Sequence, residues 1–150
     1  MTGLTLKLEK TILAPIEKVF DAWLDPALLT QFILPQPGMP QPEVENDPRE
    51  GGRFSIVMIH GDDELPHSGS YLVIDRPRQL KFTWQSHYSP DDSTVTLDFT
   101  RVDANTTRVS LTQVKFFNEE ARDAHQGGWS NILDSLAVFF QPGEARSVPG

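Results

Sequence analysis

The sequence contains no cysteine, which excludes disulfide frameworks, thiolate metal sites and cysteine nucleophiles. It also lacks any apolar run near the roughly 20 residues that a membrane-spanning helix needs. Its amino terminus alternates apolar and polar residues, unlike a signal peptide. Basic residues are scarce, since 13 Lys and Arg stand against 21 Asp and Glu for a net charge of −8. We therefore expect a cytoplasmic protein that spans no membrane and binds no nucleic acid, because an acidic surface repels phosphates.

The chain has 150 residues, of which 38% are hydrophobic, and this is enough for one folded core. The last apolar pattern stops at Gln141-Pro142-Gly143, and the residues beyond it carry no apolar periodicity. We predict a single domain over residues 1–142 and a flexible tail over residues 143–150.

The first forty residues predict one strand and two short helices. Residues 4–12 alternate apolar and polar side chains, which is typical of a strand with one buried face. Pro15 suits the first helical position of a short helix that continues to Trp23, because its missing N–H needs no partner there. Asp25-Pro26 combines a cap with a proline and predicts a second helix that continues through Phe32.

The middle of the chain predicts an antiparallel meander. Five prolines between residues 34 and 49 permit only a loop and a short edge strand near residues 43–45. From residue 51 to residue 115 the hydrophobic pattern has a period of two, with turns between the strands, one of them over residues 61–66. The alternation over residues 69–74 allows either face to be buried. With the amino-terminal strand, we expect seven strands whose sheet is apolar on one face.

A long helix follows the meander. Asn118 is a good N-cap, with Glu119 and Glu120 in the first turn. The helix carries an apolar stripe formed by His125, Trp129, Ile132, Leu136 and Phe140, which Leu133 widens. A helix of about twenty residues is ~30 Å long and can cross such a sheet. We therefore predict an α+β fold in which a curved seven-stranded antiparallel sheet grips the carboxy-terminal helix, with two short helices after the first strand.

An ordered set of short motifs supports this fold. They are Ala14-Pro15, Val19-Phe20, Trp23, Asp25-Pro26, Gly51-Gly52-Arg53-Phe54, Gly69 with Tyr71, Leu80-x-Phe82-Thr83-Trp84, Thr106-Thr107-Arg108-Val109, Leu111-Thr112-Gln113 and Gly128-Trp129. The set resembles the bacterial family named after the activator of heat-shock-protein ATPase, within the START-like (SRPBCC), birch-pollen-allergen-like superfamily. The resemblance covers roughly residues 6–140 and implies a helix-grip fold with a cavity between sheet and helix. Members divide among lipid or polyketide binding, cyclase-type enzymes and chaperone activation, so the resemblance implies no single function.

Two glycine pairs have structural interpretations. Gly51-Gly52 precedes a strand, whereas a phosphate-binding loop precedes a helix, so we expect a tight hairpin with positive φ. Gly127-Gly128 lies inside the long helix, where each glycine costs ~1 kcal/mol relative to alanine. We interpret this pair as a close approach of the helix to the sheet, and the alternative is a soft point that admits a ligand.

Catalytic and metal motifs are absent from the sequence. The histidines have no metal-ligand spacing, and the acidic clusters Asp62-Asp63-Glu64 and Asp91-Asp92 occupy expected hairpin tips. No serine stands in a Gly-x-Ser-x-Gly context. We predict no metal, no cofactor and no assigned catalytic residue, and we expect His125 to be a hydrogen-bonded, partly buried residue.

The candidate site is the inner wall of the predicted cavity. The sheet contributes Phe54, Ile56, Met58, His60, Tyr71, Phe82, Trp84, Ser86, Leu97, Phe99, Leu111 and Gln113, and the helix contributes His125, Trp129, Ile132, Leu133 and Leu136. His60, Ser86 and Gln113 are polar residues in the inward phase of this apolar wall. A few polar groups within an apolar wall are typical of a ligand pocket, although the same aromatic rings could simply fill a core.

The predicted cavity wall and the family resemblance together allow three functions. The first is binding of one small hydrophobic or amphipathic molecule. The second is interaction with a chaperone ATPase or another partner in a stress response, which the resemblance implies. The third is a cavity enzyme of cyclase or hydrolase type, with His125, Tyr71 or acidic residues at the mouth as acid and base. The apolar groove is also compatible with either a monomer or a homodimer.

Overall fold

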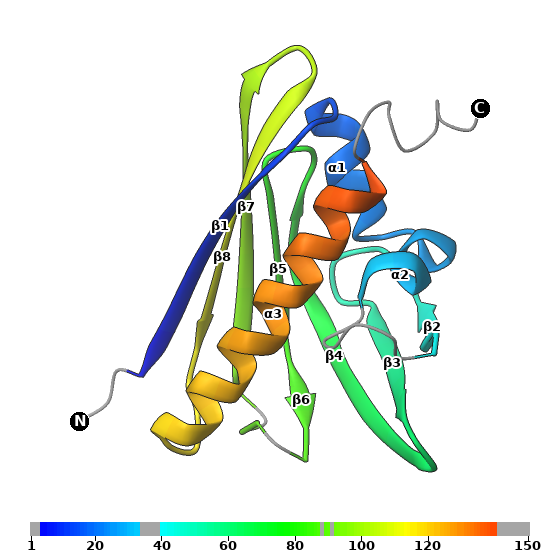
Figure 1. Cartoon of the computed structure of the whole chain (residues 1–150), viewed down its shortest axis with the longest axis vertical. Helices are drawn as coiled ribbons and strands as arrows, with labels where there is room; N and C mark the ends of the chain where they lie inside the picture. The colour runs from blue at the N-terminus through cyan, green and yellow to red at the C-terminus, as the bar shows by residue number, and fades with distance from the viewer. Residues whose placement is uncertain (1–3, 34–39, 88, 91, 141–150) are drawn as a thin grey trace.

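The structure is a computed structural model that describes residues 4–33, 40–87, 89–90 and 92–140, without the side chain of His60. The predicted tail over residues 143–150 lies outside these residues. The elements are β1 (Thr5–Ile12), α1 (Ile16–Ala22), α2 (Pro26–Phe32), β2 (Glu43–Asn46), β3 (Arg53–His60), β4 (Asp63–Asp75), β5 (Gln79–Thr83), β6 (Gln85–Ser86), β7 (Thr94–Asp103), β8 (Thr106–Val114) and α3 (Glu119–Phe139). Figure 1 shows them as one curved sheet with α3 running across it.

The strands form one antiparallel sheet in the order β1-β8-β7-β5-β4-β3-β2, and β6 pairs with β4 outside this path. The predicted α+β fold is confirmed, with an eighth strand in addition to the seven expected. The extra strand arises because the segment expected over residues 80–85 is interrupted at Trp84. The backbone N–H of Trp84 donates to the carbonyl oxygen of Ser93 at 2.8 Å. The two-residue strand β6 begins directly after Trp84.

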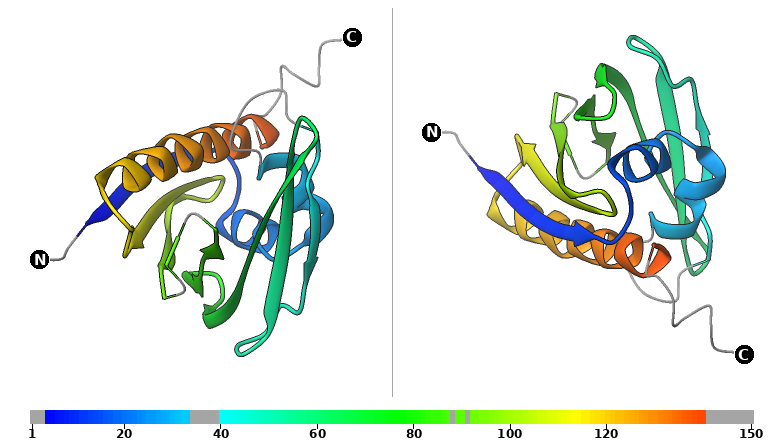
Figure 2. Two further views of the ribbon diagram at one scale, coloured as in Figure 1. Left: turned by 90° about the horizontal axis from the view of Figure 1, so that it is seen from below. Right: turned by 90° about the horizontal axis from the view of Figure 1, so that it is seen from above.

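The predicted starts of α2 and α3 are also confirmed, whereas Pro15 is the extended N-cap of α1 and not its first helical residue. The side chain of Asp25 accepts a hydrogen bond of 2.9 Å from the backbone N–H of Ala27, and Pro26 is the first residue of α2. At α3 the side chain of Asn118 accepts a 2.8 Å bond from the backbone N–H of Ala121. α3 packs against β1 on one side and α2 on the other. The left view of Figure 2 shows the sheet curling below α3, with α1 and α2 near one end.

The hairpin between β3 and β4 differs from the sequence prediction. The expected turn over residues 61–66 is confined to its first residues, where Gly61 has a φ of 64° and Asp63 already begins β4. A bulge between Tyr71 and Val73 then shifts the register of β4. This bulge is why the alternation there was ambiguous, since one extra residue changes the face that follows. Tyr71 is buried, whereas its neighbour Leu72 is exposed.

The two glycine pairs have different outcomes. Gly51 has a φ of 85°, which confirms the tight turn, and a Cβ on Gly52 would collide with the backbone oxygen of Asp47. A Cβ on Gly127 would meet no described atom within 4 Å. The predicted close approach of the helix is therefore wrong at Gly127, because this residue is on the exposed side of α3.

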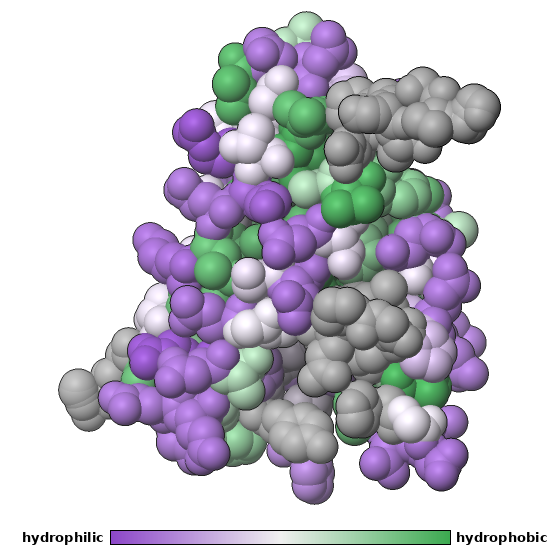
Figure 3. Space-filling view, viewed as in Figure 1, coloured by the Kyte–Doolittle hydropathy of each residue, from purple (hydrophilic) through white to green (hydrophobic). Residues whose placement is uncertain are grey.

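The buried hydrophobic residues form one cluster between the sheet and the three helices. An apolar surface patch also lies near the carboxy-terminal end of α3, where Leu13 and Val138 are exposed beside half-buried Phe139 and Phe140. Figure 3 shows hydrophobic residues gathered at this end, while hydrophilic residues dominate the face over the start of α3. Within the described part of the chain, no helix combines the length and hydrophobicity needed to cross a membrane.

Candidate ligand-binding site

The first half of α3 lies over a hollow. All residues that α3 buries occur from Trp129 onward, namely Trp129, Ile132, Leu133 and Leu136. The preceding turns present the small residues Ala121, Ala124 and Gly128 toward the sheet side. Residues three and four apart share one face of a helix, so these positions form a continuous stripe without large side chains. The space that they leave is a pocket of about 420 Å³.

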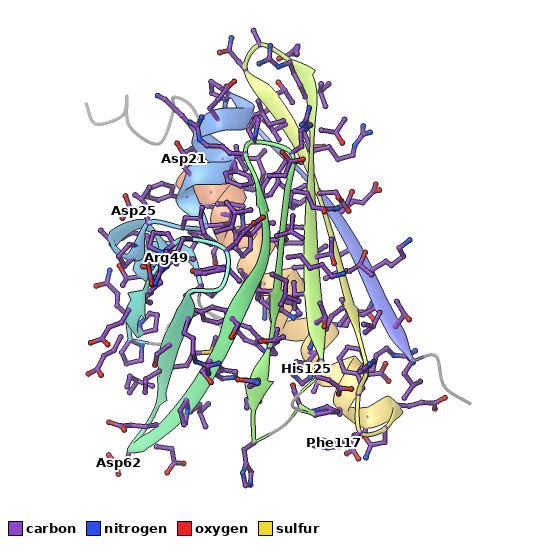
Figure 4. All side chains as sticks on the ribbon, turned by 180° about the vertical axis from the view of Figure 1, so that it is seen from behind. Asp21, Asp25, Arg49, Asp62, Phe117 and His125 are labelled. Atoms are coloured by element: carbon purple, nitrogen blue, oxygen red, sulfur yellow. The ribbon has the colours of Figure 1, made fainter. Side chains whose placement is uncertain are left out.

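The pocket is mainly apolar, with polar groups contributed by five residues. Its walls come from the β3–β4 hairpin, the segment around β6, the residues that precede α3, and α3 itself. The lining residues are Met58, Leu65, His67, Trp84, His87, Phe117, Asn118, Glu120, Ala121, Ala124, His125, Gly128, Trp129 and Ile132. Figure 4 places Phe117 and His125 together at one end of the molecule, the same end as Asp62 at the hairpin tip. Phe117 is 61% exposed, so its ring forms part of an open mouth.

Aromatic rings in tilted contact form the inner wall. The Trp84 ring lies 4.8 Å from that of Trp129 and 4.9 Å from that of His67, measured between centroids. Behind Trp84 is a second, much smaller cavity of about 20 Å³, lined by Trp23, Tyr71 and other apolar residues. This volume is enough for about one water molecule. Trp84 lines both spaces and so separates the pocket from the core.

A buried polar chain holds Trp129 in place. Its indole N–H donates to Gln113 at 2.7 Å, the Gln113 amide donates to Ser93 Oγ at 2.9 Å, and that hydroxyl donates to the carbonyl oxygen of Val114 at 2.9 Å. Gln113 and Ser93 are both fully buried. Buried polar groups are stable only when they are hydrogen-bonded, and this chain satisfies each donor. The result is a rigid connection between α3 and the sheet at the inner end of the pocket.

His125 links the first half of α3 to the segment after β6. Its Nδ1 lies 2.8 Å from the carbonyl oxygen of Ala121, and its Nε2 lies 2.8 Å from Ser89 Oγ. A carbonyl oxygen only accepts, so Nδ1 carries a proton, and in the neutral imidazole the Ser89 hydroxyl donates to Nε2. A serine donating to histidine can be a nucleophile. Ser89 is only 2% exposed and does not line the pocket, so we assign this pair a positioning role.

His67 is an uncharged wall residue. Burial lowers its pKa to about 4, an effect that the nearby His125 reinforces and the carbonyl of Leu65 opposes. Its Nδ1 donates to that carbonyl oxygen at 2.9 Å. The imidazole is therefore neutral near pH 7, and its ring packs against Trp84 with a tilt of 34° between the two planes.

The described residues contain no cluster of three or more His, Asp or Glu side chains suited to a metal ion. The arrangement is instead a preformed apolar pocket with a polar mouth.

Residues 13–141 match the family described as Activator of Hsp90 ATPase homolog 1-like protein. The chain belongs to this family. No curated protein gives a significant match to the sequence.

Solved structures share the fold. Protein CV1439 from Chromobacterium violaceum matches with a TM-score of 0.80 and 22% identity, over 93% of this chain and 99% of that one. CalU16 from Micromonospora echinospora matches with a TM-score of 0.71 and 26% identity, over 92% and 76% of the two chains. PFC0360w from Plasmodium falciparum, described as an Hsp90 activator, matches with a TM-score of 0.73 and 24% identity, over 91% and 96%. The helix-grip fold that the family resemblance implied is thus confirmed.

The structure divides the predicted site residues of this family member among several places. Met58, Trp84, His125, Trp129 and Ile132 line the pocket. Phe54, Ile56, Tyr71 and Phe82 line the small inner cavity together with Trp84. Leu97, Phe99, Leu111, Gln113, Leu133 and Leu136 are buried in the core and line neither space. Ser86 lies half-buried in β6, and His60 ends β3, with its side chain outside the described atoms.

Sequence reasoning missed the residues that shape the mouth. Leu65 and His67 were missed because β4 begins earlier than expected. Phe117 and Glu120 were missed because Phe117 precedes α3 and Glu120 lies in its first turn, outside the apolar stripe. A usable signal was present in the stripe Ala121, Ala124 and Gly128, since small residues on the sheet side of a helix leave space unless the sheet rises to fill it.

Proposed function

We propose that this protein binds one small hydrophobic or amphipathic molecule in the pocket between the β3–β4 hairpin and the first half of α3. The observation that carries the proposal is the hollow of about 420 Å³ beneath the small residues of α3. This volume is within the range of roughly 300–1,000 Å³ that is typical of small-molecule sites. The mainly apolar wall supplies affinity through burial, and the polar groups at the mouth orient the ligand.

The rigidity of the inner wall supports the same proposal. Trp129 is held by Gln113, and Trp84 packs against Trp129, so two large rings have fixed positions. A binding site whose wall is already ordered loses less conformational entropy when a ligand binds. The pocket therefore needs no rearrangement of its inner wall to accept an apolar molecule.

The test is a titration with the neutral apolar dye N-phenyl-1-naphthylamine. We expect saturable dye fluorescence at one site, a change in the emission of Trp84 and Trp129, and a higher melting temperature, because a ligand that binds only the folded state stabilises it. Unchanged tryptophan emission and an unchanged melting temperature would contradict the proposal.

A matched pair of variants locates the dye. Ala124 lines the pocket, so Ala124→Leu narrows the hollow and should weaken dye binding, while leucine preserves the helix. Gln126→Leu adds the same side chain at an exposed position of α3 that does not line the pocket. This control should bind as the unmodified protein does. Equal dye affinity in both variants would place the dye elsewhere and overturn the assignment.

Activation of a chaperone ATPase is a second candidate, favoured by the family and by the similarity to an Hsp90 activator from Plasmodium falciparum. It predicts that the purified protein raises the ATP hydrolysis rate of an Hsp90-type chaperone, and an unchanged rate argues against it. A cytoplasmic location and a role in stress belong to this candidate. Light scattering distinguishes the monomer from the homodimer that the apolar groove also allows.

A further inference from the structure

Among the described residues that line the pocket, the acidic one is Glu120, and the other titratable side chains are the histidines His67, His87 and His125. Glu120 is an exposed carboxylate that lines the pocket, and no lysine or arginine is among the described lining residues. The cations nearest in sequence are already paired with acids, since Lys115 bonds Asp92 at 3.0 Å and Arg122 bonds Asp123 at 3.0 Å. The polar end of an amphipathic ligand thus meets a carboxylate rather than an ammonium or guanidinium group.

The amino-terminal end of α3 does not reverse this preference. A helix start attracts anions through its free N–H groups and its dipole. Here the N–H of Ala121 is taken by the side chain of Asn118, and Glu119 and Glu120 both occupy the first turn. The positive end of the helix therefore already has two carboxylates beside it. A fatty-acid carboxylate would add a third negative charge at the same place.

Aromatic faces also favour a cation. Phe117 is 61% exposed at the mouth, and Trp84 lies within. A cationic group over an aromatic face is attracted by the negative charge on that face. The neutral imidazole of His67 contributes no positive charge to oppose this attraction. The net charge of −8 acts in the same direction over a longer range.

We propose that the pocket is selective for a cationic amphiphile, an apolar chain or ring system that ends in an amine or quaternary ammonium group. This inference rests on the proposed function and names its ligand class. The apolar part lies between Trp84 and the small-residue stripe of α3. The cationic end lies at the mouth, beside the Glu120 carboxylate and the exposed ring of Phe117.

The experiment compares three ten-carbon probes that differ only in their polar end: decylamine, decanol and decanoate. Each probe displaces N-phenyl-1-naphthylamine from the purified protein, at concentrations below its micelle threshold. We expect decylamine to bind roughly fivefold more tightly than decanol, as one partly exposed ion pair or cation–π contact provides. Decanoate should be the weakest of the three.

Two variants distinguish the effect of the Glu120 carboxylate on ligand affinity from the effect of the net charge of the protein. Glu120→Gln keeps the length of the side chain, and we expect the amine-to-alcohol affinity ratio to fall to near one. Glu119→Gln makes the same change of net charge one residue earlier, at a position that does not line the pocket. The ratio should remain high in this control. Circular dichroism confirms that both variants retain α3.

The failures of the two proposals are distinguishable. If none of the three probes and no dye binds, the proposed function itself is wrong. If decanol and decanoate bind as tightly as decylamine, the pocket binds ligands without this selectivity and the present inference is overturned. An equal loss of selectivity in Glu119→Gln and Glu120→Gln also overturns it, because the preference would then reflect only net charge.

Discussion

Trp23 and Trp129 are buried to almost the same extent, at 3% and 2% exposure, but their indole N–H groups differ. That of Trp129 donates to Gln113 at 2.7 Å. That of Trp23 has no hydrogen-bond partner within the part of the chain that the structure describes. The two rings therefore allow the contribution of one buried hydrogen bond to be measured inside a single core.

Replacing each tryptophan by phenylalanine should have unequal costs. Both changes remove ring volume, but Trp129→Phe also leaves the Gln113 oxygen buried and unpaired, which costs roughly 1–3 kcal/mol. Trp23→Phe removes a donor that has no described partner. We expect urea unfolding to give a loss of stability for Trp129→Phe that exceeds that for Trp23→Phe by this amount. Equal losses would contradict the importance of the Gln113 bond.

Gly127→Ala should stabilise the protein. Gly127 is exposed in the interior of α3, and an added Cβ meets no described atom within 4 Å. Alanine is favoured over glycine in a helix by up to about 1 kcal/mol. The expected result is a higher midpoint in urea.

Gly51→Ala serves as a control for Gly127→Ala, because we expect it to lower the stability instead of raising it. Its φ of 85° is unfavourable for a residue with a Cβ, although no described atom obstructs the side chain. The cost of such a left-handed conformation is about 1–2 kcal/mol. A loss of stability in Gly127→Ala would show that the helix needs glycine at this position for another reason.

Stability should fall in mildly acidic solution because of His67. Its pKa is lowered to about 4 from the usual 6.5, mainly by burial, so the unfolded chain binds a proton more readily than the folded one. The free energy of unfolding is therefore unaffected by the protonation of His67 above pH 6.5, where both states are unprotonated, and it decreases as the pH falls toward 4. Since a tenfold change in proton affinity corresponds to about 1.4 kcal/mol, the lowered pKa contributes roughly 3 kcal/mol to the pH dependence.

Unfolding by urea at several pH values between 7 and 4 measures this effect. His67→Gln removes the titrating group, and we expect its stability to vary less over this interval than that of the unmodified protein. If the free energy of unfolding depends on pH in the same way in both proteins, His67 is not the group that causes the loss of stability in acid.

Ser89→Ala should loosen the first half of α3. The hydroxyl of Ser89 is bonded to His125 at 2.8 Å, whereas the second half of the helix is held by buried residues such as Trp129 and Leu136. The loss of one such bond costs about 1 kcal/mol. Hydrogen exchange should therefore become faster over residues 119–126 and remain nearly unchanged over residues 129–139. Uniform acceleration along the helix would contradict this local role.

Much of the fold could be predicted because local physical rules govern its elements. The caps at Asp25 and Asn118 and the positive φ of Gly51 depend on a few neighbouring residues. The alternation of β3 and β8 likewise identifies their buried faces. The start of β4 and the break at Trp84 were less predictable, since both depend on pairing with distant strands.

The predicted cavity wall shows more clearly what hydrophobic periodicity alone does not predict. Periodicity identified inward-facing residues, but it could not distinguish Leu97, which fills the core, from Met58, which lines the pocket. Both side chains are apolar and both face the helices. The difference depends on which parts of the other elements lie opposite each residue, and periodicity carries no information about that placement.

The amino-acid sequence alone determined the strand and helix pattern, the helix caps and the acidic charge, because these depend on residue type and short-range spacing. Only the tertiary structure decided where the space lies. A pocket forms where the small residues of α3 meet a part of the sheet that does not rise to fill the gap, and that requires the relative placement of segments far apart in the chain. The same placement brought Glu120 to the mouth and Gln113 to Trp129, and neither relationship has a signature in the sequence.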